Sequence, residues 1–361
     1  MESILSTSQH YPLNQIYFYL TEGCNLACRH CWLAPRFDPS LKNTTFLPVE
    51  LYKQVITEAI PLGLRGVKLT GGEPFLHPRF EELLAITRQE ELSLTIETNG
   101  VLCTPKIAQK IAEFPHRFVS VSLDGADAAT HEAIRGVPGS FEKTCHAVKI
   151  LVEADVRPQI IFSVMRVNAH QVEMAIDLAE KLGAESIKFN VIQPTERGEH
   201  LSKQNNALSI NEYISLSHKV DIRLTRVNRI NVFFDLPMVF HSIHRLVNGN
   251  NGHCDILGIL GVLPDGQYAL CGIGELLPEL VFGRIGIDNL IEIWKDTPIL
   301  NELRQGLPQK LNGICQRCIV KEICLGSCIA QNMYSSHNLW APYWFCKEAE
   351  RIGLFPSSRL K

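Results

Sequence analysis

Hydrophobic and polar positions in the first 200 residues follow two alternating periods, one typical of strands and one of helices. Segments rich in β-branched and aromatic residues predict six strands, at 16–21, 66–70, 92–98, 118–123, 159–165 and 186–192. The segments between them carry apolar residues at helical spacing and predict helices at 48–60, 79–90, 105–113, 141–154 and 170–182. Strands separated by such helices predict βαβ units and a parallel sheet. Six units fall short of the eight that close a complete barrel, so we expect an α/β fold with a partial (β/α)6 barrel over residues 1–200.

The alternation stops after residue 193. The polar stretch 195–209 predicts a linker, 211–221 a helix and 230–234 a strand. Residues 257–270 predict a hairpin that turns at Asp265-Gly266. Beyond residue 312 the spacing of cysteines is the dominant pattern. We therefore expect a bridging region at 201–250 and a cysteine-rich domain at 251–361.

Composition narrows the choice of partners and compartment. The 361 residues hold 35 Lys and Arg against 38 Asp and Glu, a net charge of −3, and this balance argues against nucleic acid or an acidic membrane surface as the main partner. The first residues lack the basic and apolar regions of a secretory signal. The longest apolar run, 256–263, is about half of the roughly 18 residues that span a bilayer. We expect a cytoplasmic protein in which the 12 cysteines stay reduced and serve as metal ligands.

Three of these cysteines form a CxxxCxxC pattern directly after the first strand. They are Cys24, Cys28 and Cys31, at the end of a strand where α/β enzymes place their chemistry. Three thiolates on one short loop can bind three irons of a cubane cluster, which leaves the fourth iron free to bind a small molecule. A zinc site with His30 as an additional ligand, or three buried thiols, stays open on this spacing alone.

The CxxxCxxC pattern resembles the signature of the radical S-adenosylmethionine (SAM) superfamily, and a second motif supports the resemblance. Gly71, Gly72 and Glu73 lie after the second strand and look like the family's GGEP motif, which holds the methionine amino group. The resemblance implies SAM and a [4Fe-4S] cluster as cofactors. It also implies a 5′-deoxyadenosyl radical that takes hydrogen from a substrate, and sensitivity to oxygen.

Polar residues at the ends of other strands are further candidates for SAM contacts. The resemblance implies that Arg135 pairs with the methionine carboxylate, and Ser122 is the best candidate to contact the ribose or that carboxylate. Asp124 lies in the same turn as Ser122, and Asn190 ends the sixth strand. Each of these residues could instead be an ordinary capping or turn residue.

Seven cysteines in the last third of the chain resemble the SPASM domain, which holds two auxiliary iron–sulfur clusters in a subset of radical SAM enzymes. The zinc-ribbon alternative would use only the CxxC and CxxxC pairs. The family pattern implies that the outer cluster is held by Cys315, Cys318, Cys324 and Cys346, and the inner one by Cys254, Cys271 and Cys328.

The inner cluster is one cysteine short. We expect a fourth ligand such as His253 or Asp255, an open iron, or a smaller cluster. The two remaining cysteines, Cys103 and Cys145, are interpreted as small buried hydrophobic residues.

SPASM enzymes mostly modify peptides or proteins, so the resemblance implies a precursor peptide as substrate and a reductant such as flavodoxin or ferredoxin. Gly272 stands where sulfatase maturases carry an aspartate base, which counts against that branch. No winged-helix domain precedes the first strand, so we expect a separate leader-recognition protein. This arrangement resembles the splicease maturases of Nif11 leader peptides, in which loss of tyramine leaves an α-keto-β-amino acid. Cross-linking or thioether maturases, sulfatase maturases and cofactor-biosynthesis enzymes are the alternatives. No general base is identified, but we expect a proton acceptor near the inner cluster.

Overall fold

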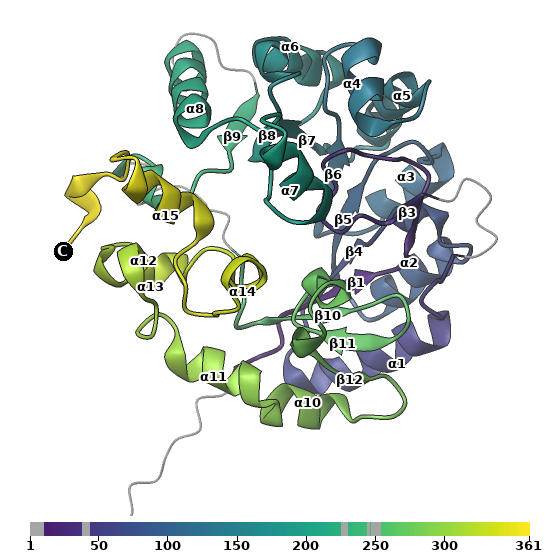
Figure 1. Cartoon of the computed structure of the whole chain (residues 1–361). Helices are drawn as coiled ribbons and strands as arrows, with labels where there is room; N and C mark the ends of the chain where they lie inside the picture. Colours follow the sequence, from purple (N-terminus) through teal and green to yellow (C-terminus); the bar gives the residue numbers. More distant parts are fainter. Residues whose placement is uncertain (1–10, 38–43, 225–229, 244–245, 247–253) are drawn as a thin grey trace, which may run out of the picture.

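The computed structural model of the protein describes residues 11–37, 44–224, 230–243, 246 and 254–361. In this part of the chain ten strands form one sheet in the order β12-β11-β10-β1-β4-β5-β6-β7-β8-β9 (Figure 1). A separate two-stranded sheet joins β2 to β3. The strands are β1 Gln15–Tyr19, β2 Gly23–Cys24, β3 Arg36–Phe37, β4 Gly66–Thr70, β5 Ser93–Thr98, β6 Arg117–Ser122, β7 Gln159–Val164, β8 Ser186–Val191, β9 Asn231–Phe234, β10 Ile259–Val262, β11 Gln267–Ala269 and β12 Val281–Arg284.

The predicted parallel sheet is confirmed, and it extends beyond the six expected strands. Those six are β1, β4, β5, β6, β7 and β8, and each neighbouring pair among them is parallel. Strand β9 continues the sheet beside β8, and β10 pairs in parallel with the opposite side of β1. The C-terminal part of the chain therefore supplies strands to the same sheet as the N-terminal part.

The predicted hairpin is also confirmed. Strands β10 and β11 are antiparallel, and the amide of Leu263 donates to the carbonyl oxygen of Gln267 at 2.9 Å. The turn needs a left-handed residue, which Gly266 supplies with φ of 85°. Strand β12 then pairs with β11 at the end of the sheet.

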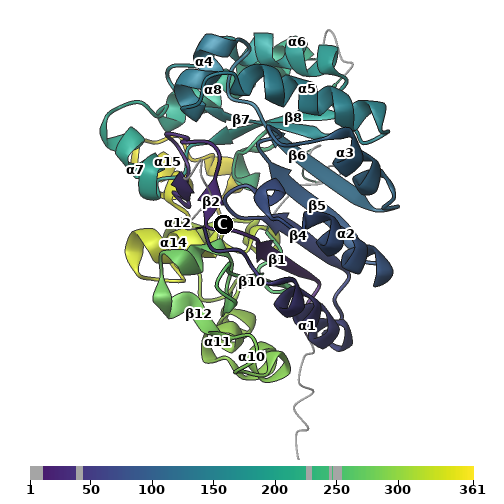
Figure 2. The same cartoon turned by 90° about the vertical axis from the view of Figure 1, so that its right-hand side faces the viewer.

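Helices α1 to α6 cover the outer face of the parallel strands (Figure 2), and the C-terminal helices lie on the side opposite α2 and α3 (Figure 1). The helices are α1 Val49–Ala59, α2 Phe80–Gln89, α3 Pro105–Ala112, α4 Ala128–Arg135, α5 Ser140–Glu153, α6 Val172–Leu182, α7 Glu196–Lys203, α8 Ile210–Leu224, α10 Leu290–Asp296, α11 Pro298–Gly306, α12 Gly313–Arg317, α13 Lys321–Cys324, α14 Ile329–Ser336 and α15 Trp344–Arg351. None of the helices in the described ranges is long and apolar enough to cross a membrane.

Side-chain alternation in β1 separates the core from the interior of the partial barrel. Ile16 and Phe18 are fully buried, and the Phe18 ring packs on Tyr52 of α1 with centroids 4.3 Å apart. Because successive strand residues point to opposite faces, Tyr17 and Tyr19 project toward the barrel interior. The same alternation directs every second residue of the other parallel strands into that interior.

The prediction of a linker over residues 195–209 is wrong, because α7 occupies residues 196–203. Its sequence is almost entirely polar, and only Gly198 and Leu201 are buried, so it lacks the apolar stripe by which a helix is recognised. Glu196 and Glu199 lie in its first turn, where carboxylates interact favourably with the helix dipole. This helix contacts the cysteine loop described below.

Candidate functional site

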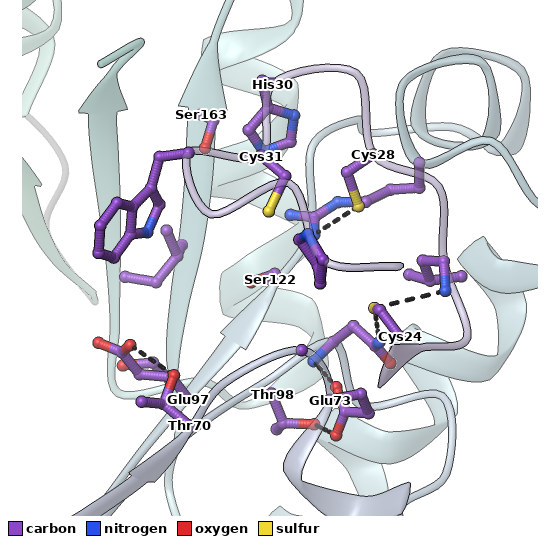
Figure 3. A pocket seen from close by; sticks show the side chains of 18 of the residues that line it. Cys24, Cys28, His30, Cys31, Thr70, Glu73, Glu97, Thr98, Ser122 and Ser163 are labelled. Atoms are coloured by element: carbon purple, nitrogen blue, oxygen red, sulfur yellow. Dashed lines mark hydrogen bonds between the residues drawn. The ribbon is translucent and has the colours of Figure 1, made fainter. Parts of the chain in front are cut away.

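A cavity of about 410 Å³ opens at the carboxyl ends of the parallel strands. Cys24, Cys28 and Cys31 line it together with Gly71 and Gly72, so the structure brings both predicted motifs to one place. Figure 3 shows the three sulfur atoms directed toward the same space. The arrangement follows from the parallel sheet, whose carboxyl ends all meet at one edge.

The cysteine loop is fixed from two sides. At the end of α4, the carbonyls of Ile134 and Arg135 accept hydrogen bonds from the loop amides of Arg29 and Ala27, both at 3.0 Å. From α7, the Arg197 guanidinium donates to the carbonyl oxygens of Cys28 and Pro35, also at 3.0 Å each. Arg197 was not predicted as a site residue, because the segment that carries it has no helical hydrophobic pattern.

Two thiols of this loop, those of Cys24 and Cys31, are costly to ionise without a compensating cation. Burial and then the negative charges of Glu73 and Cys28 raise the pKa of Cys24 far above its usual value. Burial and Cys28 likewise raise the pKa of Cys31. Since a bound metal stabilises thiolates, the donor set fits the irons of a cluster.

The side chains considered for the zinc alternative do not surround one point in the described part of the chain. Among the described residues, no three Cys, His, Asp or Glu side chains are placed to hold a single metal ion. His30, the additional ligand considered for zinc, instead places Nε2 3.4 Å from a carboxylate oxygen of Asp124.

Glu73 connects the glycine motif to the next strand. One oxygen accepts hydrogen bonds from the Thr98 hydroxyl at 2.6 Å and the Phe75 amide at 3.1 Å, and the other accepts from the Asn99 amide at 2.8 Å. Burial raises its pKa to about 7 despite these donors. The side chain therefore holds the ends of β4 and β5 together, and a direct SAM contact by its carboxylate stays a prediction.

Arg135 and Asp124 form a buried pair behind the cysteines. An Arg135 nitrogen lies 2.7 Å from Asp124 Oδ2, and another donates to the Cys28 sulfur at 3.5 Å. Burial alone would raise the pKa of Asp124, but the Arg135 and His30 charges and the Ser163 amide hold it below its usual value. Arg135 also lines the cavity, whereas Asp124 is fully buried. The structure thus places Asp124 as a partner of Arg135, and its contact with SAM stays a prediction.

The cavity wall contains other polar side chains. Ser122 and Asn190 line it as expected, and the Asn190 side-chain oxygen is buried without a hydrogen-bond partner. Thr70, Glu97 and Lys188 line it too and were not predicted. Strand alternation was the signal that could have found Thr70 and Glu97. Lys68 and Thr70 are two positions apart, as are Thr95 and Glu97, so each pair lies on one face of its strand.

The cysteines of the C-terminal part were predicted to form an outer and an inner set. A second, smaller cavity is lined by all four residues of the outer set, Cys315, Cys318, Cys324 and Cys346. In the inner set, burial and then the charges of Cys328 and Cys271 raise the pKa of Cys254, so its thiol interacts electrostatically with the other two. Their assignment as cluster ligands stays a prediction.

A fourth ligand for the inner set is not identified among the described residues. His253 lies outside the described residues, and Asp255 accepts a hydrogen bond from Asn14 at 2.9 Å. Of the two unassigned cysteines, Cys103 is buried in the core and Cys145 packs against its edge.

Comparison with known proteins agrees with this geometry. Residues 18–179 match the family model described as the Radical SAM superfamily. The chain is 30% identical over 333 residues to the AdoMet-dependent heme synthase of Methanosarcina barkeri, covering 86% of this chain and 90% of that protein. It is 25% identical to the antilisterial bacteriocin subtilosin biosynthesis protein AlbA of Bacillus subtilis, covering 92% of this chain and 70% of the relative.

Among solved structures, Streptococcus suis SuiB bound to the precursor peptide SuiA superposes with a TM-score of 0.71 at 18% identity. The match covers 94% of this chain and 76% of SuiB, and it shows the shared fold. The chain belongs to the radical SAM superfamily.

Proposed function

We propose that this protein modifies a ribosomally made precursor peptide by radical SAM chemistry. The observation that carries the proposal is one cavity that joins the CxxxCxxC sulfurs to the glycine motif, with four further cysteines around a second cavity of the same fold. When bound, the cluster and SAM supply a 5′-deoxyadenosyl radical that abstracts hydrogen, and the protein supplies orientation and a closed cavity.

The residues of the chain have distinct roles in this proposal. Cys24, Cys28 and Cys31 would hold the [4Fe-4S] cluster, and Arg135 would stabilise the Cys28 thiolate by its hydrogen bond. The backbone at Gly71 and Gly72 would contact the methionine part of SAM, with Ser122 and Asn190 along the cavity wall. The seven C-terminal cysteines would hold two auxiliary clusters.

A peptide substrate is supported by two relatives, AlbA by its role in bacteriocin biosynthesis and SuiB by its bound precursor peptide. Within this class we propose tyramine excision that leaves an α-keto-β-amino acid. The separate leader-recognition protein, the flavodoxin or ferredoxin reductant and the cytoplasmic location, where thiols stay reduced, belong to the same proposal.

Anaerobic co-expression with the small open reading frames beside the gene, followed by mass spectrometry, tests the assignment. Loss of the mass of a tyramine unit supports excision, and loss of two hydrogens selects cross-linking or thioether formation instead. An unmodified peptide in every co-expression would contradict a peptide maturase.

A second candidate is the reaction of heme synthases, which the M. barkeri relative favours because it matches over 90% of its own length. Anaerobic incubation with a porphyrin precursor, SAM and reductant separates the two. Heme in the extracted products would favour the second candidate.

A further inference from the structure

Among the described residues, two carboxylates line the cavity at the cysteine loop, and they differ in what surrounds them. Glu73 is fully buried, and three donors occupy its oxygens. The Glu97 side chain is 47% exposed, and Figure 3 shows it with Thr70 across the cavity from Cys31. Glu97 is therefore the carboxylate that a molecule in the cavity can reach.

Two neighbours hold the Glu97 carboxylate in place. Lys68 Nζ lies 2.5 Å from Oε1, and the Thr70 hydroxyl donates to Oε2 at 3.3 Å. Lys68 comes from the adjoining strand β4, so the pair bridges two strands of the barrel wall. Both neighbours orient the carboxylate on the cavity wall.

Lys68 also lies near the inner cysteine set. Its charge opposes the rise that burial imposes on the pKa of both Cys254 and Cys271, and its Nζ lies 4.6 Å from the centre of the Tyr17 ring. Lys68 thus pairs with Glu97 and also interacts electrostatically with the cysteines proposed to hold the inner cluster. A proton acceptor here would be close to an electron acceptor.

The position used for a base in sulfatase maturases is closed in this chain. A β-carbon on Gly272 would lie 2.4 Å from the ring of Tyr19, which is well inside any real contact distance. Tyr19 is itself buried between the cysteine loop and the hairpin, packed with Leu33 and Ala269. A side chain at 272 could not enter this space, so a base must come from another element.

We propose that Glu97 is a catalytic residue, the proton acceptor for the substrate radical. This role rests on the proposed modification of a precursor peptide in its oxidative form, the loss of two hydrogens, and not on tyramine excision. After a substrate carbon loses hydrogen to the deoxyadenosyl radical, the carbon radical carries an adjacent N–H or O–H group. Transfer of the N–H or O–H proton to the Glu97 carboxylate, together with loss of one electron, leaves a C=N or C=O double bond. An inner iron–sulfur cluster held by Cys254, Cys271 and Cys328 would be the electron acceptor.

The test compares E97Q with the wild-type enzyme, using the precursor peptide identified by co-expression and prepared in deuterated form. General-base catalysis is typically worth about 10²- to 10⁴-fold, so E97Q should lower product formation by about 100-fold or more. Two quantities should stay within about threefold of their wild-type values, a far smaller change than the expected loss of product. They are the deuterium transfer into 5′-deoxyadenosine and the affinity for the peptide, which fluorescence anisotropy measures. Uncoupled hydrogen abstraction should also give an electron paramagnetic resonance signal from the accumulated substrate radical.

Two variants guard against a folding defect. E97D keeps a carboxylate and should restore part of the product, and E81Q removes a carboxylate that pairs with Lys106 at 2.8 Å on the surface of α2 and should change nothing. The role is overturned if E97Q forms product at the wild-type rate, if deuterium transfer falls as much as product, or if E97Q weakens binding of peptide or SAM as much as it lowers product. Absence of deuterium transfer in the wild-type enzyme would instead reject the peptide substrate, and this role with it.

Discussion

Gly72 packs against the backbone of Gly23 so closely that a β-carbon on it would lie 1.9 Å from the Gly23 carbonyl oxygen. The amide of Glu73 donates to that same oxygen at 3.0 Å. The glycine motif and the cysteine loop are thus one packed unit, and the loop geometry depends on a missing side chain at 72.

The G72A substitution should disturb the cysteine loop, because the clash is with backbone and cannot be relieved by a rotamer change. Overpacking of this kind typically costs about 1–3 kcal/mol, and here the strain falls next to Cys24. We expect lower iron and sulfide content per chain after reconstitution. G286A is the control. Gly286 has a φ of 79°, and a β-carbon on it would have no atom within 4 Å, so the iron content of G286A should be normal. Full iron content in G72A would contradict this view of the packing.

Loss of the Arg135 side chain should destabilise the fold, since it leaves Asp124 buried without its cation. Breaking a buried pair in this way costs about 3–5 kcal/mol. Denaturant unfolding of R135A should show a loss of this size, and the double variant D124N/R135A should recover part of it. Equal stability of R135A and the wild-type protein would show that the pair contributes nothing.

The R197A substitution should loosen the cysteine loop without unfolding the protein, because Arg197 bonds only loop carbonyls from the polar helix α7. We expect faster loss of the cluster absorbance on exposure to air or to a chelator. K203A, on the same helix but directed to Glu199 at 2.7 Å, is the matched control. An equal rate of loss of cluster absorbance in the wild-type protein, R197A and K203A would contradict a role of α7 in holding the cysteine loop.

Glu73 should make stability depend on pH. Its folded pKa of about 7 is raised from 4.5, so the folded protein keeps a proton that the unfolded chain releases. The stability it contributes is therefore complete below pH 4.5 and is lost as the pH rises toward 7. In E73Q, the free energy of unfolding should fall less across this window, although lost hydrogen bonds lower it at every pH. Parallel curves for the two proteins would show that Glu73 does not titrate there.

Strand and helix periodicity predicted the barrel because the strands alternate cleanly and their helices carry apolar stripes. Helix α7 was missed because its residues are polar on nearly all sides and its position is set by contacts with other elements. The parallel pairing of β10 with β1 could not be predicted either, because the two strands are more than 240 residues apart and the sequence of neither identifies its partner.

Motif spacing predicted the cysteine groups. The structure places Cys24, Cys28 and Cys31 around one cavity and four C-terminal cysteines around another, and their roles as ligands stay predictions. Motif spacing did not show that Asp124 is a fully buried partner of Arg135. A turn residue that contacts a ligand and one that pairs with a buried arginine look alike in sequence. Motif spacing also could not identify Glu97, whose importance comes from contact with Lys68 and from the closed space beside Gly272. Both depend on packing between strands.

The most direct test of the account is reductive SAM cleavage by the anaerobically reconstituted enzyme. With SAM and dithionite, the wild-type protein should release 5′-deoxyadenosine and methionine in equal amounts. C28A should release none, C318A should retain part of this activity while losing the outer cluster, and C103A should behave as wild type. Absence of 5′-deoxyadenosine from a wild-type protein with a full iron complement would contradict the central claim.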